Sequence, residues 1–262
     1  MEFRNKIILV VGASSGMGRC VALRLAQEGA IIAATARRTE RLDQLAAEIR
    51  SLGGECMVKA ADAQDEAAAA AVVAEVVARY GRIDAVLLNA GGAPAIDMRK
   101  LSAAEVKSYM RSNYDVVVNY LVPVLAQMRR QGHGLVAHTN SLAGFAGIPL
   151  QGPYCAAKAA ARLLLDTCRI EFADFNIRFV TVYPGFVATE GTVGDGMPAP
   201  MEISEERATD HILKALRREA RDYLFPLNTA SLVRLLRILP KSISIMFLKE
   251  EYSKSVATIV TK

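Results

Sequence analysis

The sequence predicts an α/β protein in which a doubly wound parallel sheet is covered by helices on both faces, giving three layers. Short apolar runs rich in β-branched residues alternate with segments of helical periodicity along most of the 262 residues. Because these runs are apolar throughout, they are typical of strands buried on both faces. Right-handed crossovers join such units into a parallel sheet. No Pro-, Gly- or Ser-rich linker divides the chain, which indicates one domain.

In the first half of the chain, glycines and capping residues delimit the helices. Gly29 ends the first helix, Gly53 and Gly54 end the second, and Thr39 is the expected N-cap of the second. The expected strands are residues 6–11, 31–36, 55–60 and 85–89, and the expected helices are residues 16–28, 39–51 and 65–80.

The second half continues this alternation and then becomes less regular. Pro123 should kink a long helix, because proline cannot donate the helical hydrogen bond. Residues 189–203 contain three glycines and two prolines and are expected to form a mobile lid. We expect residues 1–225 to form the domain and residues 226–262 a C-terminal helical tail. The expected elements are helices over 102–130, 153–174 and 204–219 and strands over 135–140 and 177–183.

A glycine-rich loop directly follows the first predicted strand and precedes the first helix. Its glycines allow a sharp turn and a close approach of the backbone to a phosphate. The first turn of the helix adds unpaired N–H groups and the positive end of the helix dipole. In this strand–loop–helix context, the spacing GxxxGxG predicts a site for the pyrophosphate of a dinucleotide. The expected contacts are Gly12, Ser14, Ser15, Gly16, Met17 and Gly18.

The end of the second predicted strand indicates which dinucleotide is bound. A dinucleotide-binding protein selective for NAD places a carboxylate here, which bonds the ribose 2′-hydroxyl. This chain instead has Arg37 and Arg38, whose guanidinium groups suit a 2′-phosphate, so the prediction is NADP(H). After the third strand, Asp62 is either a turn residue or a contact of the adenine. Further expected contacts, after the fourth strand, are Asn89, Ala90 and Gly91.

Tyr154 and Lys158 lie one turn apart on the same face of a predicted helix. A lysine ammonium near a phenol favours the phenolate, and so does an oxidised nicotinamide, so we expect the pKa of Tyr154 to be lowered from its ordinary value of about 10. Such a tyrosine can donate a proton to a carbonyl oxygen or accept one from an alcohol. Ser141, at the end of the fifth predicted strand, can hydrogen-bond the same oxygen. These residues predict acid–base chemistry at a carbonyl or alcohol.

Together these motifs resemble those of the short-chain dehydrogenase/reductase family. The similarity covers about residues 5–225. Val11, Leu88 and Asn140 depart from the family pattern, in which Thr, Asn and Ser are usual, and none of the three is a catalytic group. The motifs that carry the resemblance are Val11 to Gly18, Leu88-Asn89-Ala90-Gly91, Ser141, Tyr154-Cys155-Ala156-Ala157-Lys158, and Tyr183-Pro184-Gly185 with Thr189.

The resemblance implies a Rossmann fold and NADP(H)-dependent hydride transfer between a carbonyl and an alcohol. It implies that Lys158 also holds the nicotinamide ribose, beside Tyr154. It further implies that Asn113 kinks the long helix and positions a water for proton relay, with Asn119 as an alternative. The helices over 102–130 and 153–174 would form the interface of a homodimer or homotetramer. The residues that would border the nicotinamide are Pro184, Gly185, Val187 and Thr189.

The C-terminal tail has an apolar stripe at helical spacing and basic residues on the opposite face. It either packs on its own domain or on a partner subunit, or it makes a peripheral membrane contact through residues 229–248. A second apolar stretch covers residues 243–248. The stripe is Leu232, Leu235, Leu236 and Leu239, and the basic residues are Arg234, Arg237 and Lys241.

Composition limits the remaining classes of function. The sequence shows no signal peptide and no membrane-spanning stretch, so we expect a cytoplasmic protein, with peripheral membrane association as the alternative. The four cysteines show no metal-binding spacing, and the net charge of +5 is not clustered, so neither a metal nor a nucleic acid is expected. The expected substrate is a lipophilic carbonyl or alcohol such as a steroid, a retinoid, a long-chain ketone or a sphingoid precursor. The alternatives are a 3-oxoacyl-thioester reductase and a non-catalytic NADP-binding sensor or scaffold.

Overall fold

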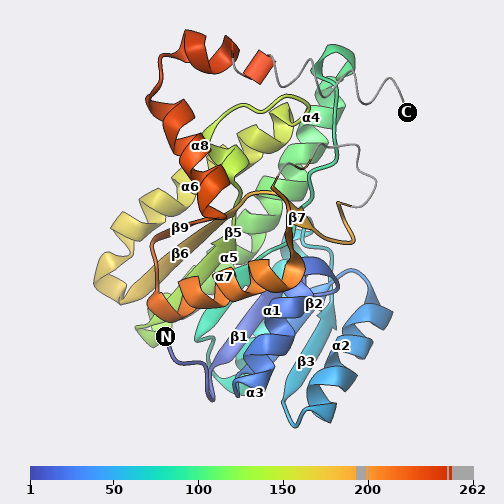
Figure 1. The fold of residues 1–262 in the computed structure, drawn as a ribbon. Helices are drawn as coiled ribbons and strands as arrows, with labels where there is room; N and C mark the ends of the chain where they lie inside the picture. The colour runs from blue at the N-terminus through green and yellow to red at the C-terminus, as the bar shows by residue number, and fades with distance from the viewer. Residues whose placement is uncertain (193–198, 200, 247, 250–262) are drawn as a thin grey trace.

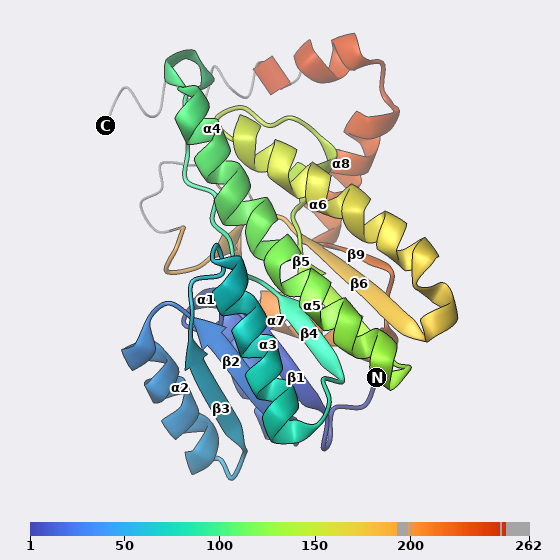
Figure 2. The ribbon, with the colours of Figure 1, turned by 180° about the vertical axis from the view of Figure 1, so that it is seen from behind.

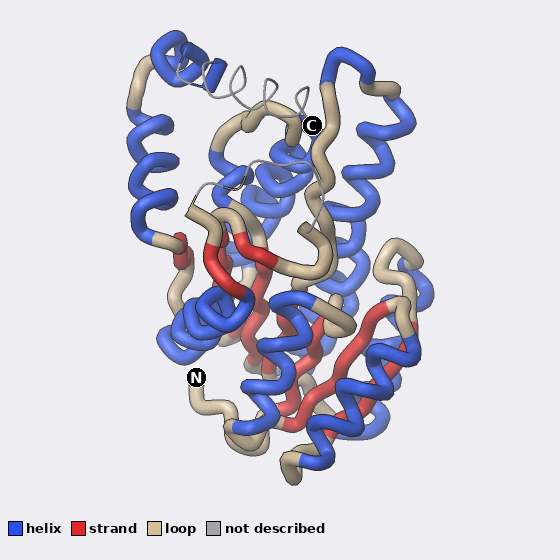
Figure 3. Tube along the Cα trace, turned by 45° about the vertical axis from the view of Figure 1, so that its right-hand side comes forward, coloured by secondary structure: helices blue, strands red, loops and turns tan. Residues whose placement is uncertain are grey.

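Seven parallel strands form the central sheet of the computed structural model, which describes residues 1–192, 199, 201–246 and 248–249. The strand order is β3-β2-β1-β4-β5-β6-β9, and each neighbouring pair is parallel (Figures 1 and 3). The doubly wound α/β fold predicted from the sequence is therefore confirmed. The strands are β1 (Ile7–Val11), β2 (Ile31–Ala36), β3 (Cys56–Ala60), β4 (Ala85–Leu88), β5 (Gly134–Thr139), β6 (Ile177–Pro184) and β9 (Asp222–Phe225).

Helices cover both faces of this sheet (Figures 1 and 2). One face carries α1, α2 and α7, and the other carries α3, α5 and α6, with α4 continuing the line of α5 beyond the sheet. The helices are α1 (Gly16–Gln27), α2 (Thr39–Ser51), α3 (Glu66–Tyr80), α4 (Ala103–Met110), α5 (Val116–Gln131), α6 (Gly152–Glu171), α7 (Glu205–Arg218) and α8 (Leu227–Ile238).

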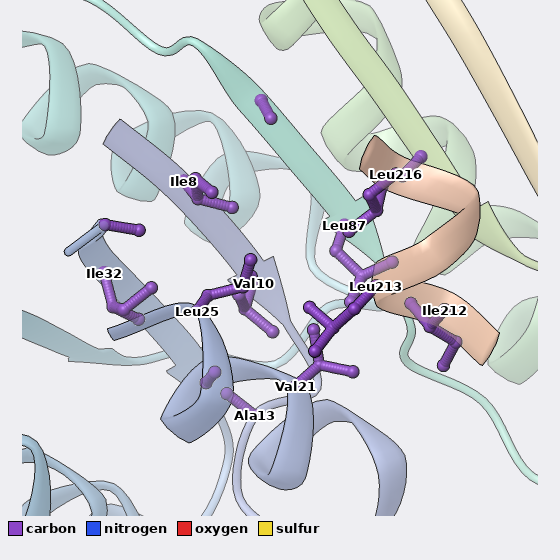
Figure 4. Packing of buried hydrophobic residues seen from close by; sticks show 14 of the residues in the cluster. Ile8, Val10, Ala13, Val21, Leu25, Ile32, Leu87, Ile212, Leu213 and Leu216 are labelled. Carbon is purple, nitrogen blue, oxygen red and sulfur yellow. The ribbon is translucent and has the colours of Figure 1, made fainter. Parts of the chain in front are cut away.

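The core consists of one apolar cluster on each face of the sheet. Ile8 and Val10 of β1 point into the cluster under α1 and α7, where Leu25 and Leu213 meet them (Figure 4). The intervening residues of β1, such as Leu9, point into the cluster under α3 and α5. Burying a side chain of this size stabilises the fold by about 1.5–3 kcal/mol. Because both faces of β1 are buried, the strand must be apolar at every position, which is the pattern seen in the sequence.

The arrangement of the strands creates a crevice at one edge of the sheet. β1 and β4 are neighbours, but the chain leaves β1 toward β2 and β3 on one side and leaves β4 toward β5 on the other. In such a sheet the loops after the two central strands diverge, and a ligand can bind between them. The glycine loop after β1 and the Asn89 segment after β4 lie at this point.

The long helix predicted over residues 102–130 is interrupted at a different place from the one expected. A π-helical turn, Arg111–Asp115, separates α4 from α5 and is centred on Asn113. α5 runs on across Pro123, so the expected distortion at that proline was misplaced. The helix departs from α-helical geometry instead at Asn113, whose buried side chain binds the loop after β4. Asn113 was the position that the family resemblance had implied.

Three further details differ from the sequence-based expectation. Arg38, not Thr39, is the N-cap of α2, because Arg38 is extended and its side chain turns toward the glycine loop. The short strands β7 (Val187–Ala188) and β8 (Ile203–Ser204) pair in parallel, so regular structure closes the two ends of the predicted lid. Within that lid, residues 193–198 and 200 lie outside the described residues. β9 was not predicted because it is short and partly exposed.

The tail begins with α8, which leaves the end of β9 and extends away from the sheet (Figures 1 and 3). Ala230 and Val233 pack against Leu142 and Tyr183, so the predicted leucine stripe is not the face that anchors the helix. Leu235 of that stripe is 49% exposed. A further helical segment covers residues 241–246. None of the helices in the described part of the chain is long and apolar enough to cross a bilayer.

Candidate active site

The glycine loop holds three segments of the chain in close contact. Gly12 has a φ of 85°, and a Cβ there would lie 2.8 Å from the Ala90 nitrogen. A Cβ on Gly18, in the first turn of α1, would lie 2.2 Å from the Gly12 carbonyl oxygen. Only glycine permits this packing. No side-chain oxygen among the described residues caps α1, so the N–H groups of its first turn are available to an anion.

A cavity of about 680 Å³ opens beside this loop and extends to the ends of β2 and β3. Most of the predicted cofactor contacts line it, whereas Gly18 supports the loop from behind. Asp62 lines the cavity, and its Oδ1 also accepts a hydrogen bond from the Gln64 nitrogen at 3.0 Å, so it is a turn residue as well. The predicted contacts that line this cavity are Gly12, Ser14, Ser15, Gly16, Met17, Arg37, Arg38, Asp62, Asn89, Ala90, Gly91 and Thr189.

The end of β2 presents two guanidinium groups to this cavity. Arg38 donates from Nε and Nη2 to Ser14 Oγ, each at 3.2 Å, and it also bonds Ser15. Its Nη1 donates to Glu190 at 2.9 Å. Arg37 is exposed at the cavity wall and forms no ion pair with any described residue. The two arginines therefore differ, because Arg38 is held in place and Arg37 is free to meet a ligand.

Asn113 fixes the loop that follows β4. Its side chain is 0% exposed, its Oδ1 accepts from the Gly92 nitrogen at 3.0 Å, and its Nδ2 donates to the Tyr109 carbonyl oxygen at 3.2 Å. A Cβ on Gly91 would lie 2.7 Å from that Oδ1. The side chain of Asn113 therefore shapes the site from behind and lines neither cavity. Asn119, the alternative, binds the Ala63 carbonyl oxygen beyond β3.

A second cavity, of about 450 Å³, adjoins the first and contains the predicted catalytic residues. Met17, Asn89, Gly91 and Thr189 line both cavities, so the two are continuous. The predicted residues that line only the second cavity are Ser141, Tyr154, Lys158, Pro184, Gly185 and Val187.

Ser141, Tyr154 and Lys158 converge in this second cavity. Ser141 follows β5 and hydrogen-bonds Tyr154, which lies near the start of α6. Lys158 is one turn further along α6, and its Nζ lies 5.6 Å from the centre of the Tyr154 ring. The same Nζ donates to the Thr139 carbonyl oxygen at 2.9 Å. The end of β5 thus positions both the serine and the lysine.

Burial dominates the protonation of this group. It raises the pKa of Tyr154 to about 12, although the hydrogen bond with Ser141 acts in the opposite direction. It also lowers the pKa of Lys158 to about 8. The expected lowering of the Tyr154 pKa was therefore wrong for this arrangement, because desolvation of the phenolate outweighs other effects and Lys158 lies over the ring face. At neutral pH the phenol is protonated and can act as a proton donor.

Asn140 connects the catalytic residues, although sequence reasoning treated it only as a departure from the family pattern. Its Oδ1 accepts from the Ser141 nitrogen at 2.8 Å, and its Nδ2 donates to the Lys158 carbonyl oxygen at 3.0 Å. A Cβ on Gly144 would lie 2.7 Å from the same Oδ1, so Gly144 leaves room for this amide. The asparagine therefore fixes the spacing between β5 and α6 where the chemistry takes place.

No sequence motif predicted the apolar wall of the second cavity. The residues of this wall come from loops, from the turn after Ser141 and from α8, so no local motif in the sequence marks them. Their shared property is that they face the space in front of Ser141 and Tyr154. They are Leu142, Ala143, Ile148, Phe186 and Val233.

A dinucleotide fits the polar groups that these cavities leave unpaired. The Asn89 Oδ1 and Thr139 Oγ1 atoms are buried and have no hydrogen-bond partner within the described residues, and both residues line the second cavity. Leaving such a group unpaired costs about 1–3 kcal/mol. The hydroxyl and amide groups of a nicotinamide riboside would satisfy them, with the pyrophosphate at α1. No group of three or more His, Cys, Asp or Glu side chains in the described segments could hold a metal ion.

Comparison with known proteins identifies the family. Residues 6–196 match the family model for short chain dehydrogenases. An uncharacterized oxidoreductase of Listeria monocytogenes is 35% identical over 192 residues, which cover 72% of this chain and 77% of that protein. The 3-oxoacyl-[acyl-carrier-protein] reductase FabG of Thermotoga maritima is 33% identical over 192 residues, 73% of this chain and 78% of that protein. The structure of an alcohol dehydrogenase from Thermococcus sibiricus, complexed with 5-hydroxy-NADP, has a TM-score of 0.76 at 28% identity and covers 85% of this chain and 96% of that chain.

The chain belongs to the short-chain dehydrogenase/reductase family, which confirms the resemblance drawn from its motifs. It is an oxidoreductase of that family, whose members bind NAD or NADP and act on small molecules.

Proposed function

We propose that the protein interconverts a ketone or aldehyde and an alcohol with NADP(H), and that Tyr154 is the general acid and base. The observation that carries this proposal is the convergence of Ser141, Tyr154 and Lys158 in a cavity that adjoins the dinucleotide cavity. The bound nicotinamide would supply hydride in reduction and accept it in oxidation. The intact catalytic group argues against a sensor or scaffold without turnover.

Each catalytic residue has a distinct part in this chemistry. The protonated phenol of Tyr154 donates its proton to the carbonyl oxygen, which becomes the alcohol oxygen. The Ser141 hydroxyl hydrogen-bonds the same oxygen and stabilises the charge that develops on it. Lys158 is anchored by the Thr139 carbonyl oxygen and retains further N–H donors for the ribose hydroxyls of the cofactor. Asn113 holds the loop after β4. We propose that Asn113 also positions a water molecule for proton relay.

The proposed substrate is lipophilic, because Leu142, Ile148, Phe186 and Val233 form the apolar wall of the second cavity. Oxidation of NADPH should be measured with ketones and aldehydes graded by chain length and ring number, which include steroid, retinoid and sphingoid-type ketones. Turnover that rises with lipophilicity supports the proposal. Turnover confined to 3-oxoacyl thioesters would favour the alternative suggested by the relative FabG.

Arg37 and Arg38 support NADP(H) as the preferred cofactor, because both line the cavity directly after β2, and this stretch of the chain contains no Asp or Glu. An Arg37→Asp substitution is expected to lower the ratio of kcat/KM for NADPH to that for NADH by about 10-fold or more, since it removes a charge-assisted hydrogen bond and adds a repelling charge. Steady-state kinetics with both cofactors gives this ratio. Lys107→Glu on the exposed surface of α4 is the control for net charge. An unchanged ratio in Arg37→Asp would show that Arg37 does not select the cofactor.

We also propose a homodimer or homotetramer formed through α5 and α6. Both helices carry large apolar side chains on the outer surface, where Val122 is 62%, Leu163 58% and Ile170 78% exposed. The two helices lie side by side on this face (Figure 2). Packing of this surface against the same surface of a second copy would remove these side chains from water. Light scattering coupled to gel filtration gives the oligomeric state, and a monomer at working concentration would contradict the proposal.

The outer surface of the tail supports a peripheral contact with an anionic membrane. Leu227 and Ile238 of α8 and Met246 beyond it are exposed, and residues 227–249 contain four Lys or Arg and no Asp or Glu. A self-complementary dimer through this face would bring like charges together, whereas the anionic lipids of a cytoplasmic leaflet would attract them. The inner face of α8 reaches the catalytic cavity through Thr229 and Val233, so a lipophilic substrate could enter from the bilayer.

The full chain is therefore expected to float with phosphatidylserine-containing liposomes at low salt and much less with neutral ones. Ile238→Glu combined with Ile245→Glu should abolish flotation, because it places two charges on the exposed apolar surface. Leu52→Glu, at an exposed apolar residue that follows α2 and lies away from the tail, is the control. If the double variant and the unaltered chain float to the same extent, the membrane contact is disproved.

A further inference from the structure

Glu190 is the acidic side chain that lies within the dinucleotide cavity beside the arginines of β2 and α2. It lines that cavity, and its Oε1 accepts from Arg38 Nη1 at 2.9 Å. The same oxygen lies 3.8 Å from Arg41 Nη2. Glu190 comes from the segment after β7, 152 positions from Arg38 in the sequence. A carboxylate from one segment of the lining therefore binds a guanidinium group from another.

The turn that carries Glu190 is held firmly. The Thr189 nitrogen donates to Thr192 Oγ1 at 2.9 Å, and that hydroxyl donates to the Val187 carbonyl oxygen at 3.1 Å. A Cβ on Gly16 would have Thr189 atoms as its nearest neighbours, at 3.7 Å, so this turn lies against the glycine loop. The position of Glu190 is thus set by the backbone of the turn, and its contact with Arg38 does not depend on a freely moving loop.

The groups around Glu190 are those that suit a phosphate. Arg38 also bonds Ser14 and Ser15, so guanidinium and hydroxyl donors converge on the space that the Glu190 carboxylate enters. Arg and Ser side chains next to a helix N-terminus form a typical site for a phosphate group. A carboxylate and a phosphate both accept hydrogen bonds from these donors, and they repel each other when close.

We propose that Glu190 is a specificity-determining residue, an internal anion that occupies the 2′-phosphate site and competes with the 2′-phosphate of NADP(H) for Arg38. This inference rests on the proposed function, because it requires that Arg38 faces the 2′-phosphate. NAD(H) carries only a hydroxyl there and leaves the Glu190–Arg38 pair intact. NADP(H) must displace the carboxylate, so part of its binding free energy is used to break that pair.

The test measures the binding of 2′,5′-ADP and of 5′-AMP, which differ only in the 2′-phosphate, to the unaltered protein and to Glu190→Gln by titration calorimetry. Glu190→Gln is expected to tighten the binding of 2′,5′-ADP by up to about fivefold, the upper range for an exposed ion pair, while the affinity for 5′-AMP stays nearly unchanged. Glu40→Gln, at the start of α2 and outside the cavity, makes the same change in net charge and is the control. In the double variant Arg38→Ala/Glu190→Gln the gain should disappear, because the site of competition is gone.

Weaker or equally changed binding of both nucleotides in Glu190→Gln would overturn the inference and make Glu190 an ordinary anchor of its turn. If both the unaltered protein and Glu190→Gln prefer 2′,5′-ADP to the same degree, the inference fails while the proposed NADP(H) preference stands. If neither protein distinguishes the two nucleotides, the NADP(H) preference fails, and the inference fails with it.

Discussion

Tyr154→Phe is expected to lower kcat for carbonyl reduction by about 10³-fold and to leave NADPH binding nearly unchanged. General acid catalysis by a positioned side chain contributes about 10²–10⁴-fold, and the Tyr154 phenol is the proposed proton donor in the second cavity. The loss of one hydroxyl leaves the ring between Ser141 and Lys158, so the fold and the dinucleotide cavity should persist. Single-turnover reduction followed by NADPH absorbance gives the rate, and titration of NADPH gives the affinity.

Tyr223→Phe is the matched control, because that hydroxyl bonds His211 near α7 and lies outside both cavities. It should retain full activity. A Tyr154→Phe enzyme within about tenfold of the unaltered rate would mean that another group supplies the proton, since that loss lies below the range for general acid catalysis. Ser141, which shares the hydrogen bond with Tyr154, would then be the first residue to test.

Gly18→Ala is expected to destabilise the protein by about 3 kcal/mol and to abolish measurable dinucleotide binding. Helix propensity alone predicts the opposite sign, because alanine in a helix is favoured over glycine by about 1 kcal/mol. The methyl group would lie 2.2 Å from the Gly12 carbonyl oxygen and 2.7 Å from Asn89 Nδ2. The first neighbour is backbone, so α1 must move away from β1, and the glycine loop moves with it. Urea unfolding measures the stability, and NADPH titration measures the binding.

Gly53→Ala separates this clash from the general cost of replacing a glycine. Gly53 has a φ of 78° and nothing within 4 Å of its missing Cβ, so its substitution should cost only about 1 kcal/mol, and cofactor binding should be retained. If Gly18→Ala proved as stable as the unaltered protein, the close packing of α1 on the glycine loop would be disproved.

The sequence predicted those parts of the molecule that local chemistry determines. The strands β1, β2 and β4 were predictable because burial on both faces requires continuous apolar runs, as in Ile7–Val11. The glycine loop was predictable because Gly12 and Gly18 have a steric reason to be glycine. The pair Tyr154 and Lys158 share one face of α6 because they are four residues apart.

Other features depend on contacts between distant segments, and the sequence could not reveal them. β9 is a strand because it pairs with β6 at the edge of the sheet, although its own pattern is partly exposed. The protonation of Tyr154 depends on burial, so a prediction from the charges of Lys158 and an oxidised nicotinamide had the wrong direction for this arrangement. The Glu190–Arg38 pair joins residues that are 152 positions apart. The face of α8 that anchors the tail was hidden because Ala230 and Val233 are less apolar than the leucine stripe.

The π-helical turn at Arg111–Asp115 changes the direction in which the side chains of α5 point relative to those of α4. A π turn accommodates one more residue than an α-helical turn, and one residue corresponds to about 100° of rotation about a helix axis. A helical wheel drawn in one phase through α4 and α5 therefore assigns the wrong face to one of them. The extra residue lets Asn113 reach the loop after β4 while Tyr120 and Val124 still point into the core. In a related chain with one residue fewer at this point, the residues of α5 would be rotated relative to those of α4. Such a chain would lose either the hydrogen bond from the loop after β4 to Asn113 or the packing of α5 on the core.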